Sequence, residues 1–316
     1  MGSQHARIIS ESSSEELTSI FDPDDISAKQ LVARYGGNIA NHFEELFECD
    51  AVILASPTSV HNEQAHQLLM EKVPLLVEKP LSVEFEEVAE LCSLAKNNQT
   101  VLMCGFVERF NPSVQLAMDL CKEENVIHIT AQRHSPFDSR KLGNVVHDLL
   151  IHDIDLTLRL MNKGLPTEIF GSSWHSSNGL EEISDCTLKF DDESLGSLSS
   201  SRMSHRKIRT LSVLTESKLI EVDLLRADVT VYRNVRQELQ SEASSLTYRS
   251  ETIIDIPFVR HSGEPLASEH RFFFDLIRGE SDPNQEINSI LPPHSVASEI
   301  EEQCNRFSSN EDKYKP

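Results

Sequence analysis

The chain has 316 residues and a formal net charge of −22, and hydrophobic residues make up 39% of it. This composition suits a soluble globular protein. It argues against nucleic-acid partners and against docking on an anionic membrane, because both need an excess of lysine and arginine. No apolar run approaches the roughly 20 residues of a membrane-spanning helix. The six cysteines form no C-x-x-C pair, so we predict reduced thiols in a cytoplasmic protein with room for two domains.

Strand and helix signals alternate in the first third of the chain. We predict strands at 16–22, 50–57, 73–80 and 100–106, and helices at 25–36, 58–72 and 82–99. Ser82 is expected to cap the last of these helices. Short buried strands that alternate with helices indicate an α/β doubly wound parallel sheet, which we assign to residues 1–107.

The pattern changes after residue 107. Helices at 112–123 and 146–162 flank a strand near 126–134, and closing helices follow at 264–279 and 295–308. Strand-like segments lie between them at 167–176, 184–190, 195–203, 208–215, 218–223, 228–234 and 249–258. This order predicts an α+β domain over 108–316 with a large, mostly antiparallel sheet. One face of that sheet needs cover, so we expect self-association into a homodimer or homotetramer through 184–203 and 208–234.

The segment LLVEKPLS (75–82) ends an apolar strand on two opposite charges and a proline. In a doubly wound sheet, ligands bind beyond the carboxyl ends of the strands. Pro80 fixes its own φ and so restrains Lys79. Taken alone, the E-K-P sequence is still explained as readily by a surface Glu-Lys pair at the end of a strand.

A second candidate site lies in GNVVHDLLIHDIDL (143–156). On a helix, Asp148, His152 and Asp155 share one face, whereas Asp153 points elsewhere. A carboxylate one turn away can orient an imidazole that acts as a general base. A capping or core role and a metal site are the alternatives. Because no further His or Asp partner stands at ligand spacing, we predict no metal.

The third signal is at the start of the sequence. Gly2 resembles the last glycine of a dinucleotide-binding loop, and Asp22 follows 20 residues later, at the spacing expected for the acid that binds the adenosine ribose. The strand and the two glycines that normally precede the glycine at position 2 are not in the sequence. We therefore expect an open slot beside the strand at 16–22, with Met1 near the pyrophosphate site. We also expect that an added upstream strand and loop would raise dinucleotide affinity and stability together.

These segments, together with DAVILASPTSVHNEQA (50–65), resemble the glucose–fructose oxidoreductase / inositol dehydrogenase family over nearly the whole chain. GFVERFNPSVQ (105–115) and residues 133–156 look closest to its nucleotide-sugar branch, the UDP-N-acetylglucosamine 3-dehydrogenase type. The resemblance implies a dinucleotide-binding domain at 1–107 and a substrate-binding and oligomerisation domain at 108–316.

The resemblance also implies a cofactor site. Asp22 would bind the adenine ribose diol, which favours NAD over NADP, because the acidic residues after it suit a 2′-phosphate poorly. Glu78 and Lys79 would lie near the nicotinamide and its ribose. The other residues that would line the dinucleotide are Gly2, Ser56, Pro57, Thr58, His61 and Pro80.

Catalytic roles follow from the same resemblance. Lys79 would stabilise alkoxide character on the substrate oxygen, and His152, oriented by Asp148, would act as the general base. Arg109 and Arg133 are predicted to bind an anionic part of the substrate, with a structural role as the alternative. The implied function is an NAD(P)-dependent oxidoreductase for a secondary alcohol of a sugar or nucleotide sugar. The alternative is a truncated or non-catalytic relative that keeps the fold but binds the dinucleotide weakly.

Overall fold

A computed structural model describes residues 1–137, 144–239, 247–260 and 263–308 of the chain. The chain divides into two compact units. The first unit comprises Met1–Val107 with Gly263–Ser298, and the second comprises Glu108–Ser262 with Glu299–Pro316. The predicted functional division, with dinucleotide binding at 1–107 and substrate binding and oligomerisation at 108–316, stays a prediction.

Residues 263–298 pack with the first unit, although they follow the second unit in the sequence. The helices α7 (Pro265–Arg278) and α8 (Pro283–Ser308) supply this packing. His294 accepts a hydrogen bond from the backbone N–H of Leu81 at 3.1 Å, and its ring meets the ring of Phe106 edge to face. Such contacts far apart in sequence leave no local pattern, which is why the division was not predicted.

The parallel strands of the first unit form two separate sheets. β1 (Ser19–Ile20) pairs with β2 (Asn38–Ile39). β3 (Val52–Leu54), β4 (Leu75–Glu78) and β5 (Leu102–Gly105) form the other sheet in that order. Every residue of β4 and β5 is buried, as expected for strands covered on both faces. The predicted parallel sheet is confirmed.

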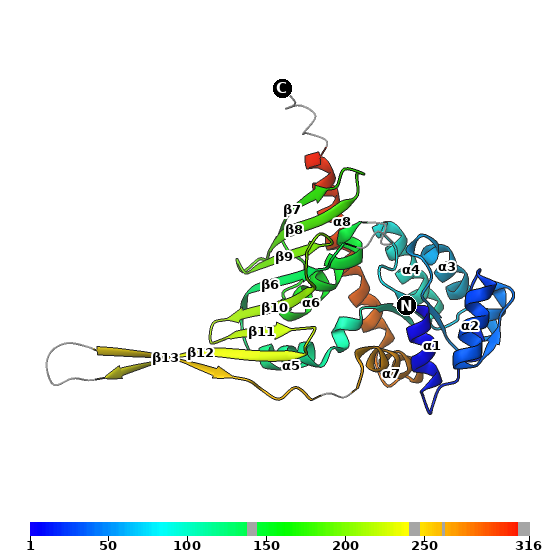
Figure 1. Cartoon of the computed structure of the whole chain (residues 1–316), viewed down its shortest axis with the longest axis horizontal. Coiled ribbons are helices and arrows are strands. Elements are labelled where there is room, and N and C mark those ends of the chain that lie inside the picture. Colours follow the sequence, from blue (N-terminus) through cyan, green and yellow to red (C-terminus); the bar gives the residue numbers. More distant parts are fainter. Residues whose placement is uncertain (138–143, 240–246, 261–262, 309–316) are drawn as a thin grey trace, which may run out of the picture. The chain divides into compact units, whose positions relative to one another are not determined.

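Residues Gly2–Ser10 form helix α1, not a strand. Within the described residues, β1 and β3 belong to different sheets. Helix α1 contacts α2 (Asp25–Tyr35) and α7, and the three helices lie together in Figure 1.

Local sequence explains where the helices of the first unit begin and end. Asp24 caps α2 by accepting the N–H of Ile26, and Gly36, at φ 84°, ends it. The predicted cap at Ser82 is wrong, because α4 begins after Glu84 and Ser82 accepts the Glu84 N–H before the helix starts. The remaining helical segments of this part are η1 (Phe43–Glu48), η2 (Thr58–Val60), α3 (His61–Met70) and α4 (Phe85–Asn98).

The second unit is built on an eight-stranded sheet with the order β13-β12-β11-β10-β6-β9-β8-β7. Only β6 and β9 are parallel among these pairs of described strands, so the predicted mostly antiparallel sheet is confirmed. Figure 1 shows β12 and β13 as a long two-stranded ribbon at one edge. The strands are β6 (Val126–His134), β7 (Glu168–His175), β8 (Glu181–Lys189), β9 (Leu195–Ser201), β10 (Ile208–Thr215), β11 (Leu219–Asp223), β12 (Asp228–Leu239) and β13 (Thr247–Asp255).

Helices pack against this sheet. They are η3 (Val107–Phe110), α5 (Pro112–Cys121), and a helix predicted at 146–162 that has two parts. Its first part, η4 (Val146–Leu150), is a π-helix, and its second part, α6 (Ile151–Met161), is a regular α-helix. A Cβ added at Gly196 of β9 would lie 3.1 Å from Thr157, so glycine lets α6 approach the sheet closely. Residues 138–143, inside the segment 133–156 used for the resemblance, lie outside the described residues.

Candidate functional site

The predicted site residues of the first unit gather where the parallel strands end. Strand β4 ends at Glu78, and the Lys79–Pro80 peptide that follows is cis. The backbone N–H of Lys79 donates to Glu78 Oε2 at 3.3 Å, and the Lys79 residue itself is half-buried. The charges thus emerge at the end of a buried strand, at the edge where ligands of such sheets bind.

His61 joins two of these strand ends. Its Nδ1 lies 2.9 Å from the carbonyl oxygen of Pro80, and its Nε2 lies 2.9 Å from that of Ser56. Both neighbours are hydrogen-bond acceptors and the ring is buried, so His61 ties the loop after β3 to the turn after β4. It was predicted to line the dinucleotide. Its observed contacts also position the loop that begins at Ser56, and its role at the dinucleotide stays a prediction.

Glu78 belongs to a row of three hydrogen-bonded, buried side chains that nothing in the sequence pattern indicated. His5 Nε2 lies 2.9 Å from Glu78 Oε1, and His5 Nδ1 lies 2.8 Å from His270 Nε2. The two imidazoles stack, with their centroids 5.1 Å apart. The residues come from β4, α1 and α7, and 265 positions separate the two histidines.

Burial and charge decide which atoms donate in the hydrogen bonds between these three side chains. Burial, with a smaller contribution from His5, lowers the pKa of His270 to about 3, so its ring is neutral at physiological pH. His270 Nδ1 is buried without a partner, which leaves Nε2 as the atom that donates to His5. His5 then donates through Nε2 to Glu78, whose carboxylate accepts. Gly105 packs beside this carboxylate, because an added Cβ would lie 3.2 Å from Glu78 Cα.

Asp22 follows β1, where an acid for the adenosine ribose was predicted. Its Oδ1 accepts the backbone N–H of Asp24 at 2.9 Å. Asp24 in turn caps α2, so the two acids have different local roles. Gly2 opens α1, and a Cβ added there would be in ordinary contact with Ala55, 3.9 Å away.

In the second unit, Asp148 and His152 lie on either side of the junction between η4 and α6. The π-helical turn changes the regular spacing that was predicted to place Asp148, His152 and Asp155 on one face. Asp148 Oδ2 accepts from Arg202 Nη2 at 3.0 Å, whereas Asp155 turns to Arg109. The pairing of Asp148 with His152 stays a prediction. Single π-helical turns are frequent at functional sites.

Arg109, predicted to bind substrate, is buried in an ion pair. Its Nε and Nη2 donate to Asp155 at 2.9 and 2.7 Å, and Arg159 reaches the same carboxylate at 3.3 Å. Burial opposes ionisation of Asp155, but the two arginines outweigh it and hold its pKa below the ordinary value. The contacts of Arg109 are therefore those of a structural residue.

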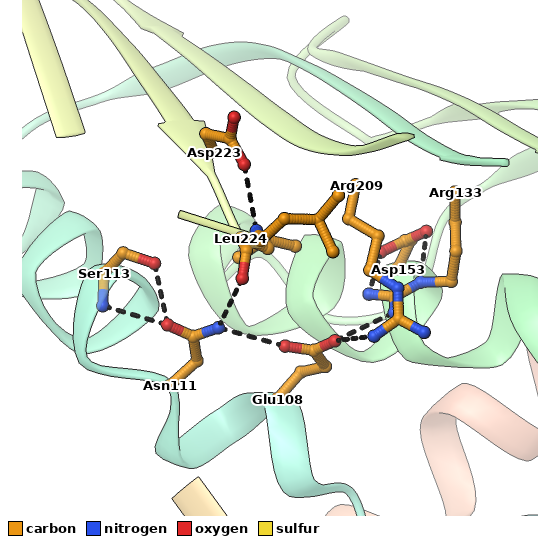
Figure 2. A network of polar contacts seen from close by, with 9 residues as sticks. Glu108, Asn111, Ser113, Arg133, Asp153, Arg209, Asp223 and Leu224 are labelled. Carbon is orange, nitrogen blue, oxygen red and sulfur yellow. Dashed lines mark hydrogen bonds and ion pairs between the residues drawn. The ribbon is translucent and has the colours of Figure 1, made fainter. Parts of the chain in front are cut away.

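Arg133, the second predicted substrate ligand, is also structural. It is 1% exposed and donates to Asp153 at 3.0 and 2.9 Å and to Glu108 at 2.8 Å (Figure 2). Burial disfavours its charge, but Asp153 and Glu108 more than compensate and raise the pKa of Arg133. These contacts favour the structural alternative, and substrate binding by Arg133 stays a prediction.

Glu108 also meets an arginine that the sequence did not single out. Arg209 Nη1 lies 3.3 Å from Glu108 Oε1, the oxygen already bound by Arg133. Asn111 donates to the other oxygen, Oε2, at 3.2 Å and caps α5 through its own side-chain oxygen. Figure 2 shows these groups converging on the Glu108 carboxylate.

Two searches of the described residues bear on other classes of site. Within this part of the chain, no group of three or more His, Cys, Asp or Glu side chains is placed to hold a metal ion. Over the same ranges, none of the helices combines the length and apolar character that crossing a bilayer requires.

Comparison with known proteins finds similar sequences and a similar fold. Residues 1–106 match the sequence model of the oxidoreductase family with an NAD-binding Rossmann fold, the family of glucose–fructose oxidoreductases and inositol dehydrogenases. The chain is 26% identical over 219 residues to the UDP-N-acetylglucosamine 3-dehydrogenase of Acidithiobacillus ferrooxidans, a match that spans 69% of each protein. It is 25% identical over 173 residues to an inositol 2-dehydrogenase of Rhizobium meliloti, a match that spans 52% of each protein.

A solved structure of the Acidithiobacillus ferrooxidans enzyme has the same fold. It superposes with a TM-score of 0.83 at 22% identity, and the match covers 97% of this chain and 95% of that one. Residues 1–106 therefore match this oxidoreductase family with an NAD-binding Rossmann fold, and the chain as a whole has the fold of the compared enzyme. The predicted family, fold class and enzyme class are confirmed.

Proposed function

We propose that the protein is an NAD-dependent dehydrogenase that moves a hydride between a secondary alcohol of a sugar or nucleotide sugar and nicotinamide. The observation that carries the proposal is the end of β4, where Lys79 follows a buried carboxylate held by two imidazoles. Glu78, Lys79 and His5 lie within the segment that matches the NAD-binding family. The names of the two relatives, one acting on a UDP-sugar and one on an inositol, support the substrate class.

The residues at the end of β1 fit NAD. Asp22 presents a carboxylate at the strand end, and Pro23, Asp24 and Asp25 follow it, which offers acceptors to a ribose diol and no cation to a 2′-phosphate. Gly2, Ser56, Pro57, Thr58 and Pro80 are proposed to line the remainder of the dinucleotide site, with His61 holding the two loops together. When bound, the nicotinamide supplies the hydride acceptor.

The residues of the chain have the following roles in this proposal. The Lys79 ammonium donates a hydrogen bond to the substrate oxygen and stabilises its developing negative charge. His152 accepts the hydroxyl proton, and Asp148 orients it. Glu78, fixed by His5, places a negative charge next to Lys79. We also propose that the protein is a cytoplasmic homodimer or homotetramer, which light scattering at micromolar concentration tests.

Cofactor binding and turnover by the unmodified protein test the function directly. Titration with NADH, followed by its fluorescence, should show saturable binding. A panel of UDP-sugars and free polyols with NAD should then show reduction of NAD by one of them. Failure to bind NADH would favour the non-catalytic alternative over a dehydrogenase.

Two substitutions test the catalytic roles. Lys79→Ala and His152→Ala should each lower kcat by about 100-fold or more while the thermal melt stays near that of the parent, because general acid–base groups contribute on this scale. Lys122→Ala, at an exposed lysine, serves as the control. Near-normal kcat in either variant would remove that residue from the mechanism.

A further inference from the structure

Two arginines stand side by side in the large sheet but are used very differently. Arg133 on β6 and Arg209 on β10 are paired in register, so their side chains leave the same face of the sheet. Both reach Glu108 Oε1, as Figure 2 shows. Arg133 makes three hydrogen bonds of 2.8–3.0 Å, whereas Arg209 makes one contact of 3.3 Å.

Arg209 has donors to spare. Its Nε is buried and has no partner among the described residues, although a guanidinium carries five N–H donors. The side chain is 29% exposed, compared with 1% for Arg133, so a ligand can reach it. A buried N–H without an acceptor is costly, and a native fold tolerates one where something else completes it.

The charges around Arg209 leave it short of negative partners. Burial and the neighbouring charge of Arg133 lower the pKa of Arg209, and the carboxylates of Glu108, Asp153 and Asp148 act against this effect. Asp153, however, is engaged by Arg133 through both oxygens, and Asp148 by Arg202. An added anion would therefore offset both the unmet donors and the repulsion between the two arginines.

The position of Arg209 connects it with the proposed site. The charge of Asp148 favours the charged form of Arg209. Asp148 belongs to the π-helical turn that leads to His152. An anion held by Arg209 would thus lie in the same unit as the proposed base and near the residue proposed to orient it. Local arginine is needed for such a ligand, because a chain with a net charge of −22 repels anions at long range.

We propose that Arg209 binds the phosphate of an anionic substrate, with a nucleotide sugar as the class that the proposed function favours. The planar guanidinium suits a phosphate because two parallel N–H donors match two of its oxygens. The inference rests on the proposed function. It assigns anion binding to Arg209, because its register partner Arg133 is 1% exposed and enclosed by Asp153 and Glu108.

Calorimetric titration with UDP at low ionic strength tests the proposal on the intact chain without cofactor. Arg209→Ala should weaken UDP binding at least 10-fold, and Arg209→Lys should weaken it less, because lysine keeps the charge but loses the fork. Arg206→Ala, at an exposed arginine three positions away, should leave the affinity unchanged. Arg209→Gln replaces the alanine variant if the latter does not melt cooperatively. Equal UDP affinity in the parent and in a folded Arg209 variant overturns the proposal.

Further ligands identify the source of the phosphate. If Arg209→Ala loses affinity for UDP but not for a hexose 6-phosphate, the ligand is a nucleotide sugar. The reverse result supports a sugar phosphate. A loss for inorganic phosphate alone overturns the proposal, since the site then serves a free anion. In turnover, Arg209→Ala should raise KM for the phosphorylated substrate and leave KM for a neutral polyol unchanged. If no sugar is oxidised while UDP binding still depends on Arg209, the proposed function fails and the anion site stands.

Discussion

The first unit holds its buried carboxylate at Glu78 with two stacked imidazoles, whereas the second unit holds Glu108, Asp153 and Asp155 with arginines. Because an imidazole is not a permanent cation, the first arrangement leaves the negative charge of Glu78 without a permanent positive partner. The second arrangement matches anions with guanidinium groups that never lose their charge. The first arrangement therefore suits a binding or catalytic site. The second arrangement suits a structural framework of buried ion pairs.

The largest effect should come from breaking the framework. Arg133→Ala leaves Asp153 and part of Glu108 buried without their cation, which should lower the free energy of unfolding by about 3–5 kcal/mol. Denaturant unfolding measures the loss, with exposed Arg226→Ala as the control. A loss below about 1 kcal/mol would mean that Arg133 is not a framework residue, and the comparison between the units would fail.

A smaller loss of stability but a clear loss of turnover is expected from the imidazole chain. His5→Ala leaves Glu78 Oε1 without its donor, which should cost about 1–3 kcal/mol. It should also lower kcat several-fold with little change in KM, because Glu78 directly precedes Lys79.

Two matched variants separate positioning from stability in this chain. His5→Gln keeps an N–H where Nε2 donates to Glu78, so it should restore much of kcat. Phe273→Leu, in the core side of the same helix as His270, should lower stability without altering kcat. If His5→Gln is as impaired in kcat as His5→Ala, the donated hydrogen bond is not what matters.

The smallest predicted effect concerns a buried carboxylate of the second unit that has no arginine. Burial, aided by the charge of Glu301, raises the pKa of Glu181 to about 7. In the unfolded chain this carboxyl ionises near its ordinary value of 4.5, so the folded state binds the proton more tightly between these two pH values. The contribution of Glu181 to stability therefore falls as pH rises from about 4.5 through about 7.

Glu181→Gln should abolish this dependence. The variant should be more stable than the parent by roughly 1–3 kcal/mol at pH 8 and by little at pH 4.5, measured by denaturant unfolding. Exposed Glu216→Gln is the control and should leave the pH profile unchanged. The assignment would be contradicted if the comparison with Glu181→Gln showed that Glu181 adds stability to the parent as pH rises from 5 to 8.

Sequence reasoning was most successful where the signal is local. The buried run of β4 and the charges after it follow from neighbouring residues, whereas the predicted cap at Ser82 was wrong. Helix α8 was predicted from residue 295 but begins at Pro283, because Pro292 and Pro293 lie inside it and such residues normally end a helix. The π-helical turn at 146–150 left no trace in the hydrophobic pattern.

The roles of polar side chains were harder to predict because they depend on distant partners. Arg133 and Arg209 are similar residues in similar strands, and only their contacts with Glu108 and Asp153 distinguish the enclosed arginine from the accessible one. Likewise, His5 and His270 are isolated histidines in the sequence, and their pairing is visible only in three dimensions.

The discontinuous first unit has a consequence for synthesis of the chain. Its two segments, Met1–Val107 and Gly263–Ser298, are separated by 155 residues of the second unit (262 − 107 = 155). The emerging nascent chain must therefore hold α1, α4 and the ring of His5 without their final cover until α7 and α8 leave the ribosome. Contacts of such large sequence separation form late and slowly. We expect the first unit to be the part of the molecule that depends most on chaperones while the chain is being made.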